Sequence, residues 1–60
     1  DRFLETLPKK QRILFVRRYF YTDSIKELAL RQGMSESAVK VSLHRIRKNL
    51  ELVLREEEFL

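Results

Sequence analysis

Basic and polar side chains recur through residues 37–48 at a spacing that suits one face of a helix. Counted at about 100° per residue from Val39, the opposite side carries Ser37, Lys40, Val41, His44 and Arg45. Lysine and arginine donate to guanine O6 and N7 or to phosphate, serine bonds to either, and valine can contact a thymine methyl. This pattern favours nucleic-acid recognition, with these side chains facing the base edges.

Lys48 lies further along the same face, Arg47 lies at its flank, and other basic side chains lie near the turn or near the starts of other predicted helices. Such positions reach backbone phosphates more easily than base edges. The phosphate candidates are Arg12, Lys26, Arg31, Arg47 and Lys48. At each position, a plain solvated charge is the alternative.

The charge of the chain is concentrated in its middle. The net charge is +4 over 60 residues, but residues 9–48 hold eleven Lys or Arg against three acidic residues, which is +8. Residues 1–8 carry −1 and residues 49–60 carry −3. A polyanionic partner is the natural expectation for the middle segment.

Catalytic and metal-binding chemistry have no support in the composition. His44 has no cysteine, aspartate or second histidine at a useful spacing, and the chain contains no cysteine. The serines lack a base that could activate them and are better explained as helix caps and small surface residues. We expect no enzyme activity, no cofactor and no metal site.

Length and hydropathy predict a soluble, cytoplasmic domain that does not enter a membrane. At 60 residues the chain is near the lower limit for a single apolar core, so we expect a stability of about 3–5 kcal/mol. No apolar run approaches the roughly 18 residues of a membrane span, and the first residues do not resemble a signal peptide. Residues 1–60 are expected to be one domain from a longer protein.

Helices must position these side chains, because one proline, one glycine and no sustained β-branched alternation give strands little support. A short helix is expected over residues 1–6. A second should hold Pro8 in its first turn and run to about Tyr21. Its expected apolar stripe is Ile13, Val16 and Phe20, widened by Leu14 and Phe15.

The third and fourth predicted helices begin at serine caps. Ser24 and Glu27 match the S-x-x-E capping box, and Gly33 suits a left-handed cap at the end of that helix. In between, Ile25, Leu28 and Ala29 face one way. Ser35 caps a fourth helix from about Glu36 into residues 54–58. Its core stripe is Val39, Leu43, Ile46, Leu50 and Val53 or Leu54.

A short helix and a longer one joined through Gly33-Met34-Ser35 have the spacing of a helix-turn-helix over about residues 24–48. An αα-corner in a bundle has the same turn chemistry. The basic face of the fourth helix favours the DNA-binding alternative, because Glu36 is the only acidic residue in its first three turns. The predicted fold class is all-α, with three main helices, a short N-terminal helix and a helix-turn-helix.

At these residues the chain resembles region 4, the C-terminal promoter-binding region of bacterial sigma-70-type sigma factors, especially the extracytoplasmic-function group. The matching residues are Leu7-Pro8, Gln11-Arg12, Arg18-Tyr19-Phe20, Ser24, Glu27-Leu28-Ala29, Gly33-Met34-Ser35, Val39-Lys40, Leu43-His44-Arg45, Arg47-Lys48 and Leu50. The resemblance implies that the fourth helix enters the major groove of the minus-35 element of double-stranded promoter DNA. The positions that meet DNA in that family correspond to Ser37, Lys40, Val41, His44 and Arg45. Also implied are an apolar surface that binds the β-subunit flap of RNA polymerase and, in many members, inhibition by an anti-sigma protein.

The chain departs from that family pattern at several positions. Arg17 stands where a leucine is usual, so either its stem lies along the core edge or the second helix is shifted. The other departures are Thr22 and Asp23 for a glycine and an apolar residue, Gln32 for a leucine, Ser37 and Ala38 for Gly and Thr, and Ser42 for a frequent arginine. The last of these affects the expected target sequence more than the fold.

Two other functions stay open. A LuxR-type response-regulator output domain shares the helix-turn-helix but acts as a dimer on two-fold sites. Apolar residues off the main stripe could supply a weak homodimer contact, namely Leu52, Phe59 and Leu60. A helical bundle whose main partner is another protein is the third interpretation.

Overall fold

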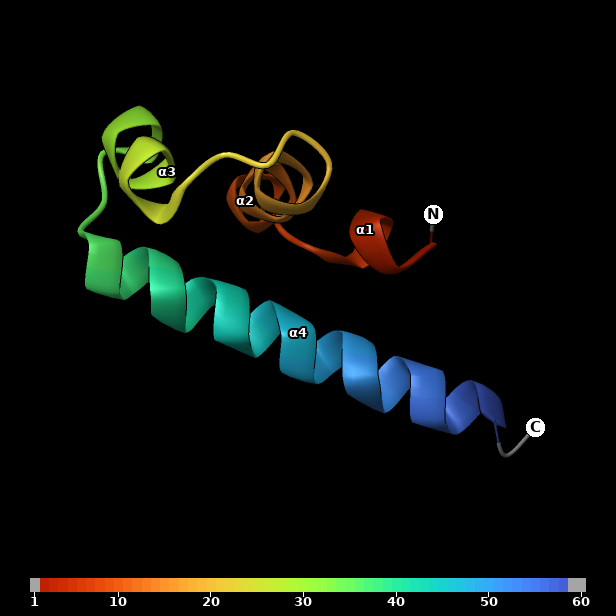
Figure 1. The fold of residues 1–60 in the computed structure, drawn as a ribbon. Helices are drawn as coiled ribbons and strands as arrows, with labels where there is room; N and C mark the ends of the chain where they lie inside the picture. The colour runs from red at the N-terminus through yellow and green to blue at the C-terminus, as the bar shows by residue number, and fades with distance from the viewer. Residues whose placement is uncertain (1, 59–60) are drawn as a thin grey trace.

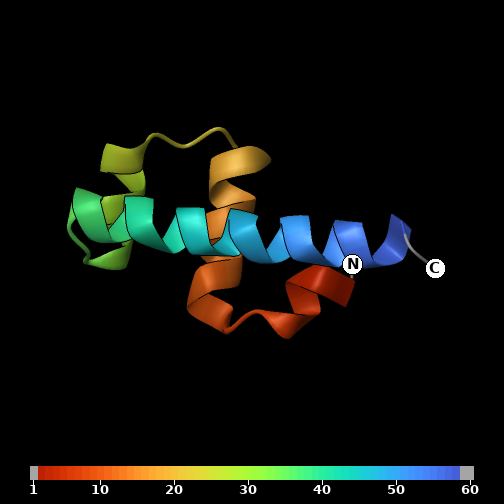
Figure 2. The same cartoon turned by 90° about the horizontal axis from the view of Figure 1, so that it is seen from below.

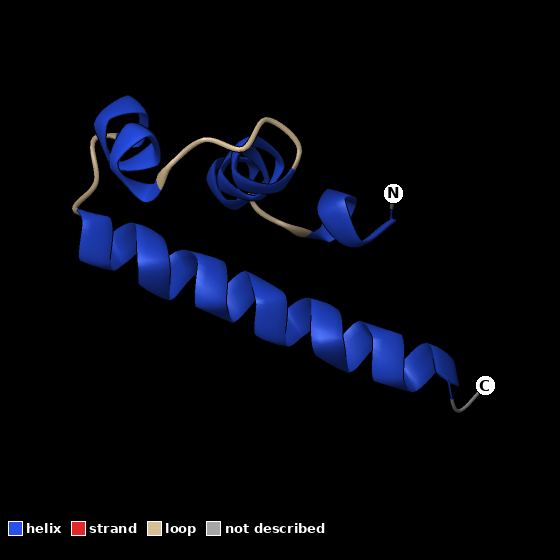
Figure 3. Cartoon of the chain, in the orientation of Figure 1, coloured by secondary structure: helices blue, strands red, loops and turns tan. Residues whose placement is uncertain are grey.

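The computed structural model describes residues 2–58, and that range contains only helices and loops (Figure 3). The helices are α1 (Arg2–Thr6), α2 (Lys9–Tyr19), α3 (Ile25–Gln32) and α4 (Glu36–Glu58). The predicted all-α class, with a short first helix and three main ones, is confirmed. Asp1, Phe59 and Leu60 lie outside the described residues, so the part of the predicted dimer contact assigned to the last two does as well.

Helix α4 forms one side of the domain, and the other three helices lie along the opposite side (Figure 1). Helix α3 lies over its start, α2 crosses its middle and α1 lies nearer its end (Figures 1 and 2). At about 1.5 Å per residue, the 23 residues of α4 span most of the 40 Å length of the molecule. One face of α4 is therefore covered along much of its length.

Two apolar clusters hold α4 to the other helices. The first joins α2, α3 and the start of α4, and consists of Leu14, Leu28, Ala29, Val39 and Leu43, with Ile25 and Met34 against it. The second joins α1 to α4 and consists of Phe3, Leu7 and Ile46, with Leu4, Phe15, Leu50 and Val53 against it. The predicted stripe of α4 is confirmed, and Val53 rather than Leu54 is its last member, since Leu54 is 52% exposed.

The predicted apolar stripe of the second helix is confirmed at Leu14 and Phe15 but is wrong at Ile13, Val16 and Phe20. Leu14 faces the core and is 1% exposed, whereas Phe20 lies beyond the end of α2 and is 72% exposed. Ile13 and Val16 lie roughly 100° and 160° around the helix from Leu14. They are half-buried and line a hollow on the surface of α2 instead of the core.

Both ends of α2 differ from the prediction by a residue or two. Pro8 precedes the helix instead of occupying its first turn, and the last helical residue is Tyr19 instead of Tyr21. Thr22 takes a left-handed φ of 58°, and the N–H of Asp23 donates to the Arg17 carbonyl at 3.0 Å. A left-handed conformation is uncommon for a β-branched residue. The chain therefore leaves α2 through a tight reversal that places Asp23 back against the helix.

Candidate nucleic-acid interface

The predicted base-facing side chains lie on the side of α4 opposite the core, which we call the outer face of α4. All of them are exposed: Ser37, Lys40, Val41, His44 and Arg45. Val39 and Ile46, on the opposite side, are both 0% exposed. Figure 2 shows α4 in front, with no other helix of residues 2–58 covering its middle in that view. The structure therefore brings these side chains together on one accessible face, where apolar Val41 is 49% exposed.

Caps on both sides of the turn fix how α4 leaves α3. Gly33 ends α3 with a left-handed φ of 62°, and the N–H of Met34 donates to the Ala29 carbonyl at 3.0 Å. The hydroxyl of Ser35 accepts from the N–H of Ala38 at 3.1 Å. A Cβ added at Gly33 would meet nothing within 4 Å, so glycine is needed there for its conformation and not for space. The predicted caps at both positions are confirmed.

The start of α3 is fixed by the predicted capping box. The hydroxyl of Ser24 accepts from the N–H of Glu27 at 3.0 Å, and Glu27 Oε1 accepts from the N–H of Ser24 at 3.2 Å. Two orphan backbone donors at the start of the helix are thereby satisfied. Leu28 and Ala29 then pack against the start of α4, which completes the helix-turn-helix.

Two predicted phosphate candidates extend into solvent. Lys26 lies in the first turn of α3 and Lys48 lies on α4, and both are exposed. Lysine in such positions acts as a mobile point charge toward a polyanion. Either lysine can therefore bind a phosphate of DNA at the outer face of α4 without being held in one side-chain conformation.

Two other phosphate candidates are held by neighbouring side chains. Arg31, at the end of α3, places its Nε 3.8 Å from Oδ2 of Asp23. Arg47, on α4, donates from Nη1 to the hydroxyl oxygen of Tyr19 at 3.1 Å. Both arginines remain exposed, and each has further N–H donors for a phosphate.

The fifth candidate, Arg12, belongs to a different surface. It lines an open hollow of about 310 Å³ on α2, together with Ile13, Val16, Arg17 and Tyr21. Arg12 lies roughly 160° around the helix from Leu14, which packs into the core. Its neighbours are mainly apolar, so this arginine borders a surface suited to a partly apolar partner.

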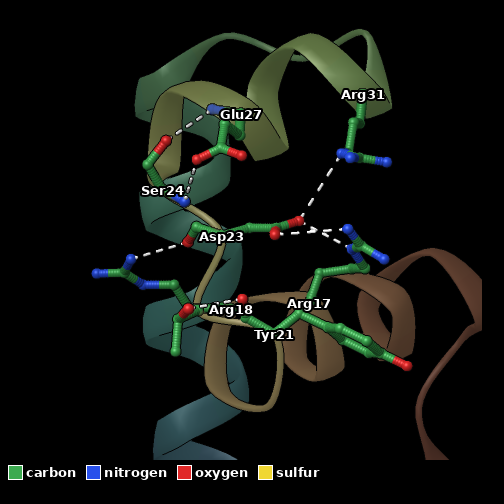
Figure 4. A network of polar contacts seen from close by, with 8 residues as sticks. Arg17, Arg18, Tyr21, Asp23, Ser24, Glu27 and Arg31 are labelled. Carbon is green, nitrogen blue, oxygen red and sulfur yellow. Dashed lines mark hydrogen bonds and ion pairs between the residues drawn. The ribbon is translucent and has the colours of Figure 1, made fainter.

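Sequence reasoning missed Asp23, which is 7% exposed and joins α2 to α3 (Figure 4). Its carboxylate accepts from Arg17 Nε at 2.8 Å and lies near Arg31, while its backbone carbonyl accepts from Arg18 Nη1 at 3.0 Å. The hydrogen bond with Asp23 raises the pKa of Arg17. The Arg17 guanidinium also lies 4.6 Å from the ring centroid of Tyr21, within range of a cation–π contact.

Two departures from the family pattern therefore explain each other. Arg17 and Asp23 stand where apolar residues are usual, six residues apart, and they form an ion pair at the junction of α2 and α3. Arg17 is half-buried, with its charged head on the carboxylate. Opposite charges at two expected apolar positions were the signal that could have revealed this contact.

Comparison with known protein families matches residues 1–50 to sigma-70 region 4. No curated protein and no solved structure gives a significant match. Because the family match covers most of the chain, the chain belongs to the sigma-70 region 4 family. Domains of that family contain a helix-turn-helix, bind DNA and act in transcription, where they interact with DNA and RNA polymerase. It is not a known family of enzymes.

Two further features of the described range bear on its partners. No helix between residues 2 and 58 combines the length and the apolar character needed to cross a bilayer. Within the same range, no three potential ligating side chains of His, Cys, Asp or Glu are grouped closely enough to hold a metal ion.

Proposed function

We propose that this chain is the promoter-binding region 4 of a bacterial sigma factor of the extracytoplasmic-function type, working in the cytoplasm with RNA polymerase. In this proposal the outer face of α4 enters the major groove of the minus-35 element. The observation that carries it is the exposure of Lys40, His44 and Arg45 on the helix side opposite buried Val39 and Ile46. The resemblance over residues 7–50 supports the extracytoplasmic-function type.

Each side chain of the outer face has a chemical role in this proposal. Lys40 and Arg45 donate to guanine O6 and N7 or to phosphate, Ser37 and His44 hydrogen-bond to base edges, and Val41 contacts a thymine methyl. Flanking cations bind backbone phosphates and set the register of the helix. The proposed phosphate contacts are Lys26, Arg31, Arg47 and Lys48, whereas Arg12 remains a weaker candidate because it borders the hollow on α2. In this proposal the chain is a single domain of a longer protein, and about residues 24–48 are its helix-turn-helix.

The hollow on α2 supports a second proposed contact, with the β-subunit flap of RNA polymerase. Ile13 and Val16 are half-buried there, and Tyr21 is 61% exposed. This surface lies on α2, so a protein bound there can leave the outer face of α4 free for DNA. An anti-sigma protein that covers the outer face of α4 would block promoter recognition, and one that covers the hollow would block the contact with RNA polymerase.

Titration of the chain with a duplex of promoter-like sequence tests the DNA-binding proposal. Lys40→Ala or Arg45→Ala should weaken binding by about 1–3 kcal/mol where the residue contacts a base. Arg2→Ala, an exposed arginine on α1, is the matched control and should bind like the wild type. Binding of the wild type should also fall steeply as salt rises, because each neutralised phosphate releases counterions.

Two outcomes would contradict the proposal. One is binding that does not change with salt. The other is equal affinity for the wild type and for both outer-face variants while all remain folded by circular dichroism. A duplex of scrambled sequence, titrated in parallel, separates sequence-specific binding from general attraction to phosphate.

The family match favours a sigma factor over a LuxR-type regulator. Leu52 is nonetheless 56% exposed on α4, which supports a weak homodimer of the free chain. Sedimentation at increasing concentration tests this, and a Leu52→Ser variant that sediments like the wild type would exclude a contact through this residue.

A further inference from the structure

One side-chain hydrogen bond joins the end of α2 to the edge of the proposed DNA interface. Arg47 Nη1 donates to the hydroxyl oxygen of Tyr19 at 3.1 Å, across 28 residues of sequence. Tyr19 is the last residue of α2 and is 42% exposed. Both groups are therefore accessible to a partner that approaches α4 from the side of α2.

The ring of Tyr19 is anchored by other aromatic rings. Its centroid lies 4.9 Å from that of Phe15, and Phe15 in turn lies 6.1 Å from Phe3, which is 8% exposed. Such tilted and edge-on pairs are favourable arrangements of aromatic rings. An aromatic row thus runs from α1 through α2 and ends in a hydroxyl that holds a guanidinium on α4.

Helical phase places Arg47 at the border between the core side and the outer face. It follows Lys40 by seven residues, which brings the two side chains to within roughly 20° of each other around the axis, and it follows His44 by three. The Arg47 guanidinium thus lies on the same edge of α4 as two proposed base-facing residues. A phosphate beside the groove that α4 enters would lie in this direction.

The hydrogen-bond chemistry leaves room for such a phosphate. An arginine has five N–H donors, of which this contact uses one, and a tyrosine hydroxyl that accepts from arginine keeps its own hydrogen to donate. A planar guanidinium held in place can bind a phosphate with two parallel hydrogen bonds. A free arginine side chain must first lose its rotational freedom, which reduces the affinity it contributes.

We propose that Tyr19 is a positioning residue for Arg47, and that the pair binds one phosphate of the DNA backbone at the α2 side of α4. This inference rests on the proposed function, because it assigns a further contact to the same interface. Tyr19 holds the guanidinium in place before DNA arrives, and the hydroxyl hydrogen adds one donor to the same phosphate.

Tyr19→Phe is the sharpest test, because it removes only the hydroxyl and keeps the ring that packs on Phe15. It should weaken binding to a promoter-like duplex about 3- to 10-fold, the effect expected for one loosened side chain and one lost donor. The melting temperature should stay close to that of the wild type. Arg2→Ala, an exposed arginine of α1 outside both proposed binding surfaces, is the control and should leave the affinity unchanged.

Arg47→Ala separates positioning from a merely structural effect. It should lower the slope of log affinity against log salt by about 0.9, the value for one lost phosphate contact, whereas Tyr19→Phe should leave that slope nearly unchanged. In the Arg47→Ala background, Tyr19→Phe should have a smaller effect than in the wild type, since the side chain that it positions is gone and only the donor of the hydroxyl is lost.

Two results would overturn this inference. Tyr19→Phe could bind as tightly as the wild type, or it could weaken binding equally with and without Arg47. If either occurs while Lys40→Ala and Arg45→Ala still lose affinity, the proposed DNA interface stands and only the role of Tyr19 fails. If none of these variants weakens DNA binding, both the role of Tyr19 and the proposed DNA interface fail.

Discussion

The two connections on either side of α3 are built differently. Each contains one residue with a left-handed backbone, Thr22 with φ 58° before α3 and Gly33 with φ 62° after it. The connection after α3 is fixed by Gly33 and by the Ser35 cap, within a few residues of sequence. The connection before α3 instead relies on Asp23, which reaches back to Arg17 and across to Arg31.

This difference separates local from tertiary determination. Glycine and a serine cap set the turn that leads into α4 by backbone preference, so that turn needs no distant partner. A threonine in a left-handed conformation is unfavourable by itself, and the Asp23 ion pairs offset this cost only when α2 and α3 are already in place. The orientation of α4, which presents the outer face, is thus set by the connection after α3, which depends less on contacts with other helices.

Leu28→Ala should have the largest effect, because Leu28 is 0% exposed and packs α3, the helix between the two connections, against α2 and α4. Removing it should lower the free energy of unfolding by about 2–5 kcal/mol, comparable to the whole stability expected of a chain this small. Circular dichroism during urea denaturation should show a largely unfolded chain. Leu30→Ala, on the same helix but 76% exposed, is the control and should unfold near the wild-type midpoint.

Asp23→Leu should have the next largest effect and acts on the first connection alone. It leaves the half-buried Arg17 without its carboxylate, so the melting temperature should fall by several degrees. The double variant Arg17→Leu with Asp23→Leu restores the apolar pair usual in the family, and it should recover most of the loss. Thermal denaturation of Asp23→Leu, of Arg17→Leu and of the double variant gives the coupling free energy between the two residues. Additive losses in the double variant would show that the two residues act independently.

Substitutions at the two left-handed residues, Thr22 and Gly33, should have the smallest effects, and they should change the free energy of unfolding in opposite directions. Gly33→Ala should lower the free energy of unfolding by about 1 kcal/mol, because alanine resists a left-handed backbone although space is available. Thr22→Gly should raise it by about 0.5–1 kcal/mol by relieving the strain of a β-branched residue. Urea denaturation measures both. A destabilised Thr22→Gly would mean that the threonine hydroxyl, which donates to the Tyr21 carbonyl, outweighs the strain.

The parts of the structure that depend on neighbouring residues were predictable from sequence. The caps at Ser24, Gly33 and Ser35 each act within about four residues, and the stripe of α4 follows from its repeat alone. Phe20 was wrongly assigned to the core because α2 was expected to continue to Tyr21, and the early end at Tyr19 leaves Phe20 on the surface.

Contacts between helices were not predictable in the same way. The pairing of Arg47 with Tyr19 and the apolar hollow along Ile13 and Val16 depend on how α2 crosses α4, which no local pattern specifies. Helical phase identified the outer face of α4 correctly as exposed, because burial of Val39 and Ile46 leaves only one other side. Which bases that face meets depends on DNA and stays a prediction.

The central claim is that the outer face of α4 binds duplex DNA. Its most direct test is the nuclear magnetic resonance spectrum of the ¹⁵N-labelled chain during titration with a promoter-like duplex at low salt. The account predicts that amide shifts concentrate in residues 37–48, with smaller changes at Lys26, while Ile13 and Val16 stay unperturbed. Shifts centred on the hollow of α2, with Lys40, His44 and Arg45 unchanged, would contradict it.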